Sequence, residues 1–314
     1  MQAGVIKMDN LVVLDFGSNS VRFSINQITG KNTFKEILRR KATTRLAEGM
    51  GLTAGEKRLT PAAIKRTLAA VADFKKIYQQ YSNYQVVGIA TAAVREAVNR
   101  KSLIDQVYQQ TGCRLQVLSA HEETYFDYLA VMNSLLLKDC LIFDIGGGSC
   151  ELALVKSGKF QTGVSLPFGA VSLGEKFTAA NLTAAKLFAL QTFLRKQFSA
   201  LFWLQQASDL PLVLLGGCNR SVARIKRTEL KLQPIDSFHG FKMTTKDFTE
   251  IYQRLLGLDN QQRKQVPGME AMRSDIILAG MTPVILLLQQ LHCSQVVFSE
   301  SGAREGFIYQ QLSQ

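Results

Sequence analysis

The alternation of apolar and polar positions divides the chain into short strands and helices that follow one another throughout. Stretches with apolar residues three or four positions apart predict helices, for example from Pro61, behind the capping residue Thr60, to about Tyr81. Because strands alternate with helices, the pattern predicts an α/β fold with mixed sheets. The predicted strands are the short apolar runs at 11–14, 86–90, 114–118, 141–145, 160–164, 211–215 and 295–298.

One stretch between two of these strands has the clearest chemical pattern. The run Leu141–Phe143 leads into Asp144, and after Gly146–Gly148 and Ser149 the chain passes Glu151 into a second apolar run. This order predicts a strand, a tight turn and a strand. Glycine amides can approach an anion closely, and the two acids could hold a divalent cation beside it. A plain turn explains the glycines equally well, and this stretch alone leaves both interpretations open.

The same order of residues occurs near the start of the chain. An apolar run ends in Asp15, followed by Gly17, Ser18 and Asn19 and then by an alternating strand from Val21. The acids at 15 and 144 are 129 residues apart. Two such hairpins in one chain predict duplicated halves that face one another.

Two further strand ends carry candidate anion contacts. Arg95 comes just past the run 86–90, and open α/β sheets bind ligands at such strand ends. The run 211–215 leads into Gly216 and Gly217, which open a basic helix, and a helix N-terminus is a favourable place for an anion.

A predicted helix start near residue 119 separates two neighbouring glutamates. Ser119 and Glu122 have the spacing of a capping box, which gives Glu122 a structural role. Glu123 is not used by this cap and projects from the first turn. His121 is either a ligand or base, or a polar residue at a helix start; the second interpretation is favoured because no second His or Cys lies at ligand spacing.

The composition favours a globular protein with an anionic partner. The chain has 314 residues, enough for two domains, with 46% apolar and 20% charged residues. It holds 37 basic and 25 acidic residues, a net charge of +12, which attracts polyanions. Because no basic stripe alternates with aromatics and no zinc-finger or homeodomain spacing appears, a specific nucleic-acid site is not predicted. A polyphosphate chain or a nucleotide would satisfy the same charge.

The cysteines and the hydropathy bear on location. The five cysteines are an odd number without metal-ligand or redox spacing, which indicates free thiols in a reducing cytoplasm. No apolar run of about 18 residues occurs, so no membrane span is predicted, and the first ten residues lack a signal-peptide core.

Taken together, these motifs resemble the exopolyphosphatase / guanosine pentaphosphate phosphatase (Ppx/GppA) family, in its short two-domain form. The resemblance implies two ribonuclease H-like domains of the actin, sugar kinase and heat-shock ATPase superfamily with a cleft between them. The expected domains are 1–124 and 125–299, with a helix at about 300–314 packing back on the first. The matching segments, in the family's order, are Asp15–Arg22, Ala90–Arg95, Ser119–Glu123, Asp144–Glu151, Leu166–Val171, Gly216–Gly217, Pro267–Gly280 and Gly302–Gly306.

The resemblance also implies an activity, a metal and a set of roles. The family hydrolyses a terminal phosphoanhydride of polyphosphate or guanosine pentaphosphate with Mg²⁺, and a homodimer is expected. Glu123 matches the catalytic base, and Asp144 and Glu151 match the metal-binding acids. The positions expected to hold phosphate are Gly17, Ser18, Asn19, Arg22, Arg95, Gly146, Gly147, Gly148, Ser149 and Gly217.

Five positions depart from the family pattern, and two other functions remain open. Ala120 replaces a glycine and Thr124 an alanine on either side of the glutamates, and Ser172 replaces an arginine. Cys150 and Cys218 replace threonines, which is expected to remove hydroxyl donors near the phosphates. The alternatives are a kinase or ATPase of the same superfamily, and a polyphosphate- or nucleotide-binding regulator without catalysis. Phosphate release that depends on Glu123 would separate the hydrolase from both.

Overall fold

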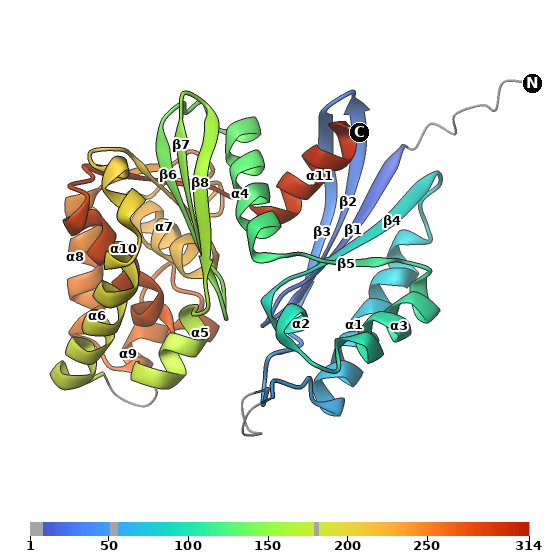
Figure 1. The fold of residues 1–314 in the computed structure, drawn as a ribbon, viewed down its shortest axis with the longest axis horizontal. Helices are drawn as coiled ribbons and strands as arrows, with labels where there is room; N and C mark the ends of the chain where they lie inside the picture. The colour runs from blue at the N-terminus through green and yellow to red at the C-terminus, as the bar shows by residue number, and fades with distance from the viewer. Residues whose placement is uncertain (1–8, 51–55, 179–181, 314) are drawn as a thin grey trace, which may run out of the picture. The chain divides into compact units, whose positions relative to one another are not determined.

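Two β-sheets organise the chain, one in each of two units (Figure 1). The computed structural model describes residues 9–50, 56–178 and 182–313. Within these ranges, the first unit runs to Glu123 and resumes at Phe307, and the second unit is Thr124–Gly306. The sequence predicts boundaries at 124 and 299, and the structure divides the chain at 123 and 306.

The first unit is built on a five-stranded sheet of order β3-β2-β1-β4-β5. Strands β1, β2 and β3 form an antiparallel meander, whereas β4 and β5 run parallel to β1. This is the ribonuclease H-like order expected from the sequence. The elements are β1 (Asn10–Phe16), β2 (Val21–Gly30), β3 (Thr33–Ala42), α1 (Pro61–Tyr78), β4 (Tyr84–Ala90), α2 (Ala92–Glu96), α3 (Arg100–Thr111) and β5 (Leu115–Val117).

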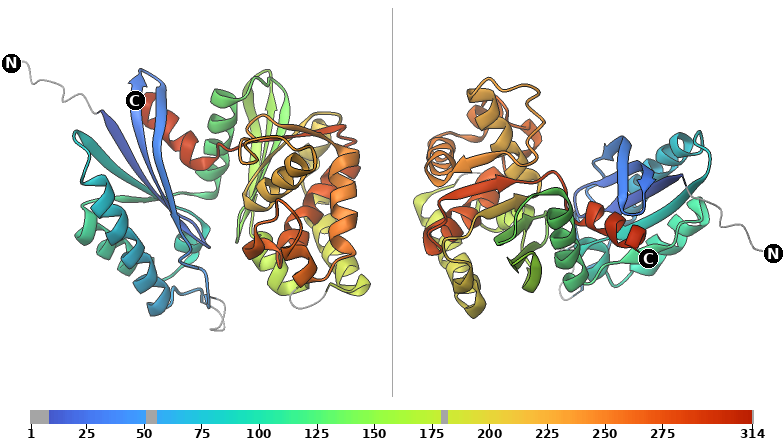
Figure 2. Two further views of the ribbon diagram at one scale, coloured as in Figure 1. Left: turned by 180° about the vertical axis from the view of Figure 1, so that it is seen from behind. Right: turned by 90° about the horizontal axis from the view of Figure 1, so that it is seen from above.

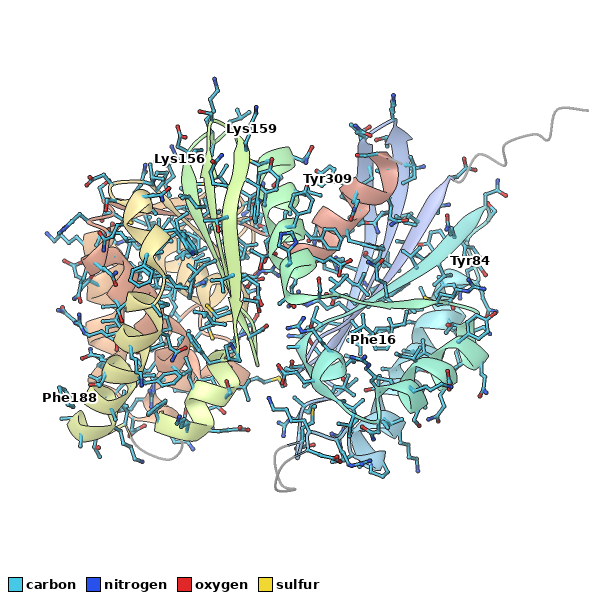
Figure 3. All side chains as sticks on the ribbon, in the orientation of Figure 1. Phe16, Tyr84, Lys156, Lys159, Phe188 and Tyr309 are labelled. Carbon is cyan, nitrogen blue, oxygen red and sulfur yellow. The ribbon has the colours of Figure 1, made fainter. Side chains whose placement is uncertain are left out.

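Helices cover both faces of this sheet. The helix α1 begins where predicted, because the Thr60 hydroxyl accepts a hydrogen bond from the Ala63 amide at 3.2 Å. It packs beside α3 on one face, where Phe74 stacks on Phe23 of β2 with ring centroids 5.1 Å apart (Figure 1). On the other face, Tyr309 of α11 (Ala303–Ser313) lies against Phe34 of β3 at 5.2 Å (Figures 2 and 3).

The second unit repeats the plan with one added edge strand. Its sheet has the order β10-β11-β9-β6-β7-β8, in which β6, β7 and β8 form the meander and β9 and β11 run parallel to β6. The elements are α4 (Ala120–Ser134), which begins in the first unit, β6 (Cys140–Ile145), β7 (Cys150–Lys156), β8 (Lys159–Leu166), α5 (Ala170–Leu173), the π-helix η1 (Gly174–Thr178), α6 (Ala184–Ser199), the 3₁₀ helix η2 (Phe202–Ala207), β9 (Leu212–Leu215), α7 (Gly217–Glu229), β10 (Lys242–Thr244), α8 (Thr245–Leu256), α9 (Asn260–Lys264), the 3₁₀ helix η3 (Ala271–Arg273), α10 (Ile277–Gln290) and β11 (Gln295–Phe298).

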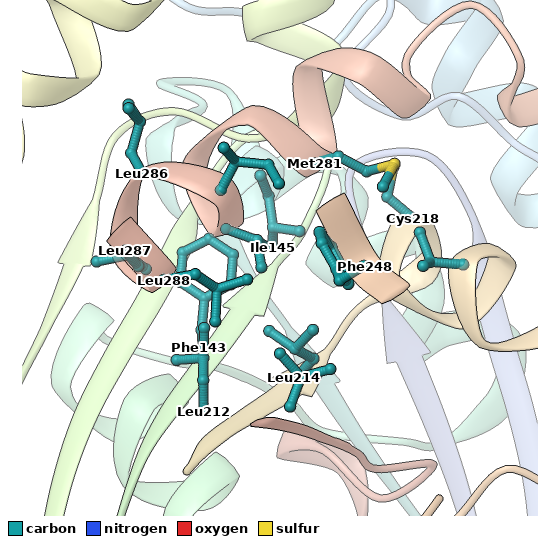
Figure 4. Packing of buried hydrophobic residues seen from close by; sticks show 14 of the residues in the cluster. Phe143, Ile145, Leu212, Leu214, Cys218, Phe248, Met281, Leu286, Leu287 and Leu288 are labelled. Atoms are coloured by element: carbon teal, nitrogen blue, oxygen red, sulfur yellow. The ribbon is translucent and has the colours of Figure 1, made fainter. Parts of the chain in front are cut away.

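The core of the second unit lies between the sheet and the helix α10. Phe143 of β6 and Leu214 of β9 pack with Leu287 of α10 (Figure 4). Pro283 lies inside α10, where a proline ordinarily kinks or breaks a helix, but the helix is unbroken there. Residues 277–288 are buried, and this packing offsets the one backbone donor that the proline lacks.

Two details complete the comparison with the sequence. The short edge strand β10 was not predicted; it pairs with β11 over three residues. Within the described part of the chain, no helix combines the length and the apolar character needed to cross a bilayer.

The aromatic stack in the first unit provides a test of its core. Replacing Phe74 by Ala removes the partner of the fully buried Phe23, and we expect a loss of about 3–5 kcal/mol of unfolding free energy. Phe188→Ala is the matched control, since this side chain is 72% exposed and points outward from α6 (Figure 3). Urea unfolding followed by circular dichroism should show an earlier transition for Phe74→Ala only, and equal midpoints would contradict this packing.

Candidate functional site

The two glycine hairpins have the same geometry in the two units. In the second unit, the amide of Gly146 donates to the carbonyl of Ser149 at 3.0 Å. In the first, Gly17 donates to Ser20 in the same way at 3.1 Å. The strands on either side are also in equivalent register, so that Asp144 pairs with Glu151 and Asp15 with Arg22. The internal repetition predicted from the sequence is therefore confirmed at the level of each turn.

In the loop at 146–149 of the second unit, backbone carbonyls accept hydrogen bonds, whereas most backbone amides have no acceptor among the described residues. The Gly146 carbonyl accepts from the Ala170 amide at 2.9 Å, and the Gly147 carbonyl accepts from the amides of Val171 and Ser172 at 3.0 and 3.2 Å. In the described residues, no hydrogen bond has the amide of Gly147, Gly148 or Ser149 as its donor. Three successive amides of this kind form a nest suited to an anion. The residues predicted to hold phosphate here are thus brought together in one turn.

The close approach of Gly169 fixes this loop. A Cβ on Gly169 would lie 2.5 Å from the carbonyl carbon of Gly147, a distance that no side chain tolerates. The start of α5 can therefore reach the loop carbonyls only because residue 169 is a glycine. The segment 166–171, which is one of those that match the family, therefore packs directly on the glycine loop at 146–149.

The loop of the first unit is held in a similar way. The carbonyls of Ser18 and Asn19 accept from the amides of Ala47 and Arg45 at 2.8 and 2.9 Å. Their own amides donate to no acceptor in the described part of the chain. The predicted cation Arg22 lies 3.9 Å from Asp15. The first loop thus pairs amides with a cation rather than with a second acid.

Three carboxylates come together beside the loop of the second unit. Asp127 of α4, Asp144 of β6 and Glu151 of β7 each offer an oxygen within 4.8 Å of the others. Asp127 and Glu151 are buried, and Asp144 is partly so. Hard divalent cations take oxygen ligands of this kind, so the donor set fits Mg²⁺.

Two glycines leave room around these acids. Gly216 has φ +91°, and a Cβ there would lie 2.7 Å from Oδ1 of Asp144. A Cβ on Gly302 would lie 3.5 Å from Oδ1 of Asp127. Glu151 is oriented by Ser165, whose hydroxyl donates to Oε1 at 2.7 Å. The space and the support around the carboxylates agree with a small cation among them.

Asp127 was missed by the sequence argument. It belongs to none of the glycine turns, and nothing in its immediate neighbours marks it as a ligand. The available signal was its position four residues after Glu123, which places both on one face of a helix.

The predicted base lies at the start of α4 in the first unit. The capping box is confirmed: the Ser119 amide donates to Oε2 of Glu122 at 2.8 Å, and the Glu122 amide donates to the Ser119 hydroxyl at 3.1 Å. The hydrogen bond from the Ser119 amide lowers the pKa of Glu122. Glu123, only 8% exposed, instead accepts from Nη1 of Arg95 at 2.8 Å. Arg95 also donates to the Leu118 carbonyl at 3.0 Å, so this predicted phosphate contact fixes Glu123 in place.

The structure shows the surroundings of three of the departures from the family pattern, Cys150, Cys218 and Ser172. Cys150 is fully buried among the core residues of β6 and β7, on the face of β7 opposite Glu151, and burial raises its pKa well above the usual value. The expectation that it removes a hydroxyl donor near the phosphate is therefore wrong, because this position faces the core. Cys218 is also buried, which raises its pKa to about 11. Ser172 caps α5, since its hydroxyl accepts from the Gly169 amide at 2.9 Å.

Gly217 lies against a cation. A Cβ on Gly217 would be 2.2 Å from the guanidinium carbon of Arg273, so the start of α7 and this guanidinium are in direct contact. Arg273 pairs with Glu270 at 2.5 Å, and Glu270 also pairs with Arg224. Burial raises the pKa of Glu270, but the two guanidiniums outweigh it and the pKa lies below its usual value.

Comparison with known proteins places this geometry in a family. The chain is 26% identical over 312 residues to the bifunctional 3-dehydroquinate synthase/phosphatase of Fusobacterium nucleatum, covering 94% of this chain and 45% of that protein. It is 25% identical to exopolyphosphatase 1 of Mycobacterium leprae, covering 96% of this chain and 89% of that protein. The chain thus spans less than half of the first relative and most of the second.

Solved structures agree with this placement. The crystal structure of the Aquifex aeolicus member of the Ppx/GppA family superposes with a TM-score of 0.81 at 27% identity, over 96% of this chain and 97% of that one. An exopolyphosphatase from Cytophaga hutchinsonii, at 20% identity, shares the fold with a TM-score of 0.88, over 96% and 97% of the two chains. The sequence profile of the Ppx/GppA phosphatase family matches residues 24–314. The two ribonuclease H-like sheets, the paired glycine hairpins and these matches show that the chain belongs to the Ppx/GppA phosphatase family.

Proposed function

We propose that this protein is a phosphoanhydride hydrolase that removes the terminal phosphate from inorganic polyphosphate, from guanosine pentaphosphate, or from both. The observation that supports it most is the turn at Gly146–Ser149, where three backbone amides that have no acceptor among the described residues lie beside the carboxylates of Asp144 and Glu151. An anion nest next to a cation site suits a phosphoryl group with its metal. The net charge of +12 favours the longer anion.

In the proposed reaction, the chain holds the terminal phosphoryl group and activates water. The amides of Gly147, Gly148 and Ser149 bind its oxygens. Glu123 takes a proton from the attacking water, the new phosphorus–oxygen bond forms, and the bond to the leaving phosphate breaks. Arg95 fixes Glu123 in one orientation through the 2.8 Å contact, which a positioned base requires. We propose that the hairpin of the first unit also binds phosphate oxygens, through its amides and Arg22.

We further propose that Asp127, Asp144 and Glu151 hold Mg²⁺. When bound, Mg²⁺ would offset the negative charge of the phosphoryl oxygens, as divalent cations do in phosphoryl transfer. Ser165 holds Glu151 in the orientation that this role needs.

A non-catalytic regulator and a kinase make different predictions for the same residues. A regulator would bind polyphosphate without releasing phosphate, and a kinase would transfer phosphate to an acceptor. The burial of Glu123 and its fixation by Arg95 favour the hydrolase, because a regulator has no need of an oriented carboxylate there.

The role of Glu123 can be tested with its neighbour as control. We expect Glu123→Gln to lower kcat for phosphate release from polyphosphate by about 10²–10⁴. Glu122→Gln keeps the capping box, because glutamine also serves at that position, and should retain near-normal kcat. Phosphate release with Mg²⁺ measures both variants. Full activity of Glu123→Gln would exclude the proposed base.

The metal site can be tested by direct binding. Removing one of three carboxylates should weaken Mg²⁺ affinity, and we expect Asp127→Asn to raise the Mg²⁺ dissociation constant at least about tenfold in isothermal titration calorimetry. Asp139→Asn is the control, because Asp139 is exposed and accepts a hydrogen bond from the Ser157 amide, as asparagine also can. Equal affinities of the two variants would remove Asp127 from the site.

A further inference from the structure

A turn at Arg45 is hydrogen-bonded to the glycine loop of the first unit. The amide of Arg45 donates to the Asn19 carbonyl at 2.9 Å, and the amide of Ala47 donates to the Ser18 carbonyl at 2.8 Å. These bonds occupy the backbone carbonyls of Ser18 and Asn19. The backbone of Arg45 therefore lies next to the candidate anion site of this unit.

Arg45 has an unusual backbone conformation for an arginine. Its φ is +46°, in the left-handed region that disfavours residues with a long side chain. In the described residues, five other non-glycine positions have positive φ, and none of them bonds to a candidate phosphate loop. Asparagine or glycine would adopt this conformation more readily, so the strain indicates a requirement for the arginine side chain.

The surroundings hold the strained turn in place. Leu46 is fully buried and anchors the turn in the core. Arg66 of α1 donates to the carbonyls of Thr44 and Arg45 at 3.0 and 3.4 Å and to Oε2 of Glu48 at 2.6 Å. The backbone of Arg45 is thus fixed by other residues and does not depend on its own side chain.

The guanidinium of Arg45 is available to a ligand. The side chain is 60% exposed, and its contact with Glu48 is a loose one of 3.6 Å, whereas Arg66 holds the same carboxylate at 2.6 Å. A phosphate oxygen can therefore replace Glu48 as the partner of Arg45 without leaving this acid unpaired.

We propose that Arg45 is a substrate-binding residue, which contacts phosphoryl groups of an inorganic polyphosphate chain at the glycine loop of the first unit. This inference rests on the proposed function. The turn at Arg45 places a guanidinium group beside the glycine loop of the first unit. A planar guanidinium can donate two hydrogen bonds at once to the closely spaced oxygens of a polyphosphate. The contact adds affinity for long chains and leaves the chemical step unchanged.

The test removes the charge without disturbing the backbone. Asparagine adopts the left-handed conformation readily, so Arg45→Asn should keep the backbone of the turn. We expect this variant to raise KM for long-chain polyphosphate about tenfold and to keep kcat within about twofold of the wild-type value. The slope of log KM against log salt concentration should fall by about one, and Arg45→Lys should recover part of the affinity. Arg58→Asn is the matched control. Arg58 is 55% exposed and pairs with Glu56, and its substitution removes the same charge from the same unit. An Arg45→Asn variant that behaves like this control would overturn the proposal.

Binding without turnover separates this inference from the proposed function. Equilibrium dialysis of long-chain polyphosphate in EDTA gives dissociation constants for the wild type, Arg45→Asn and Arg58→Asn. If the wild type binds polyphosphate but releases no phosphate from polyphosphate or guanosine pentaphosphate with Mg²⁺, the proposed function fails, and the ratio of the dissociation constants still decides the role of Arg45. If the wild type does not bind polyphosphate at all, the proposal for Arg45 is wrong, and guanosine pentaphosphate is the one substrate left to the proposed function.

Discussion

One backbone hydrogen bond sets the geometry on which the candidate site depends. The amide of Gly146 donates to the Ser149 carbonyl and closes a turn whose remaining amides have no acceptor in the described part of the chain. The same bond keeps β6 and β7 in the register that places Asp144 opposite Glu151. An anion nest and a pair of acids on one face of the sheet therefore follow from a single turn. Gly169 and Gly216 complete it, because side chains at these positions would collide with residues 144–147.

The duplicated turn serves a different purpose in each half. Where the second unit has Glu151 opposite Asp144, the first has Arg22 opposite Asp15, and Lys41 of β3 is the next residue in that row. An acid pair can hold a cation, whereas an acid–arginine pair retains a positive charge for an anion. One fold used twice thus yields one turn suited to metal and phosphate and another suited to phosphate alone.

Features that depend on local sequence were predictable, and features that depend on distant contacts were not. The two hairpins, the helix start at Thr60 and the capping box of Ser119 follow from neighbouring residues, because turn and cap geometry is local. Asp127 joins the acids only through the packing of α4, and Cys150 is directed to the core by the alternation of β7. The helix α10 continues through Pro283, since tertiary burial overrides a helix-breaking residue.

Each glycine loop has a feature beside it that costs folding free energy. Three carboxylates whose oxygens lie within 4.8 Å of one another would repel if all three were ionised. Arg45 holds a left-handed conformation that asparagine or glycine would adopt at lower cost. Natural proteins keep such violations where function needs them. A bound cation would reduce the repulsion among the carboxylates, and the binding free energy of a polyanion would offset the backbone cost at Arg45. The positions that are costly for folding are therefore the ones at which ligands would stabilise the folded protein.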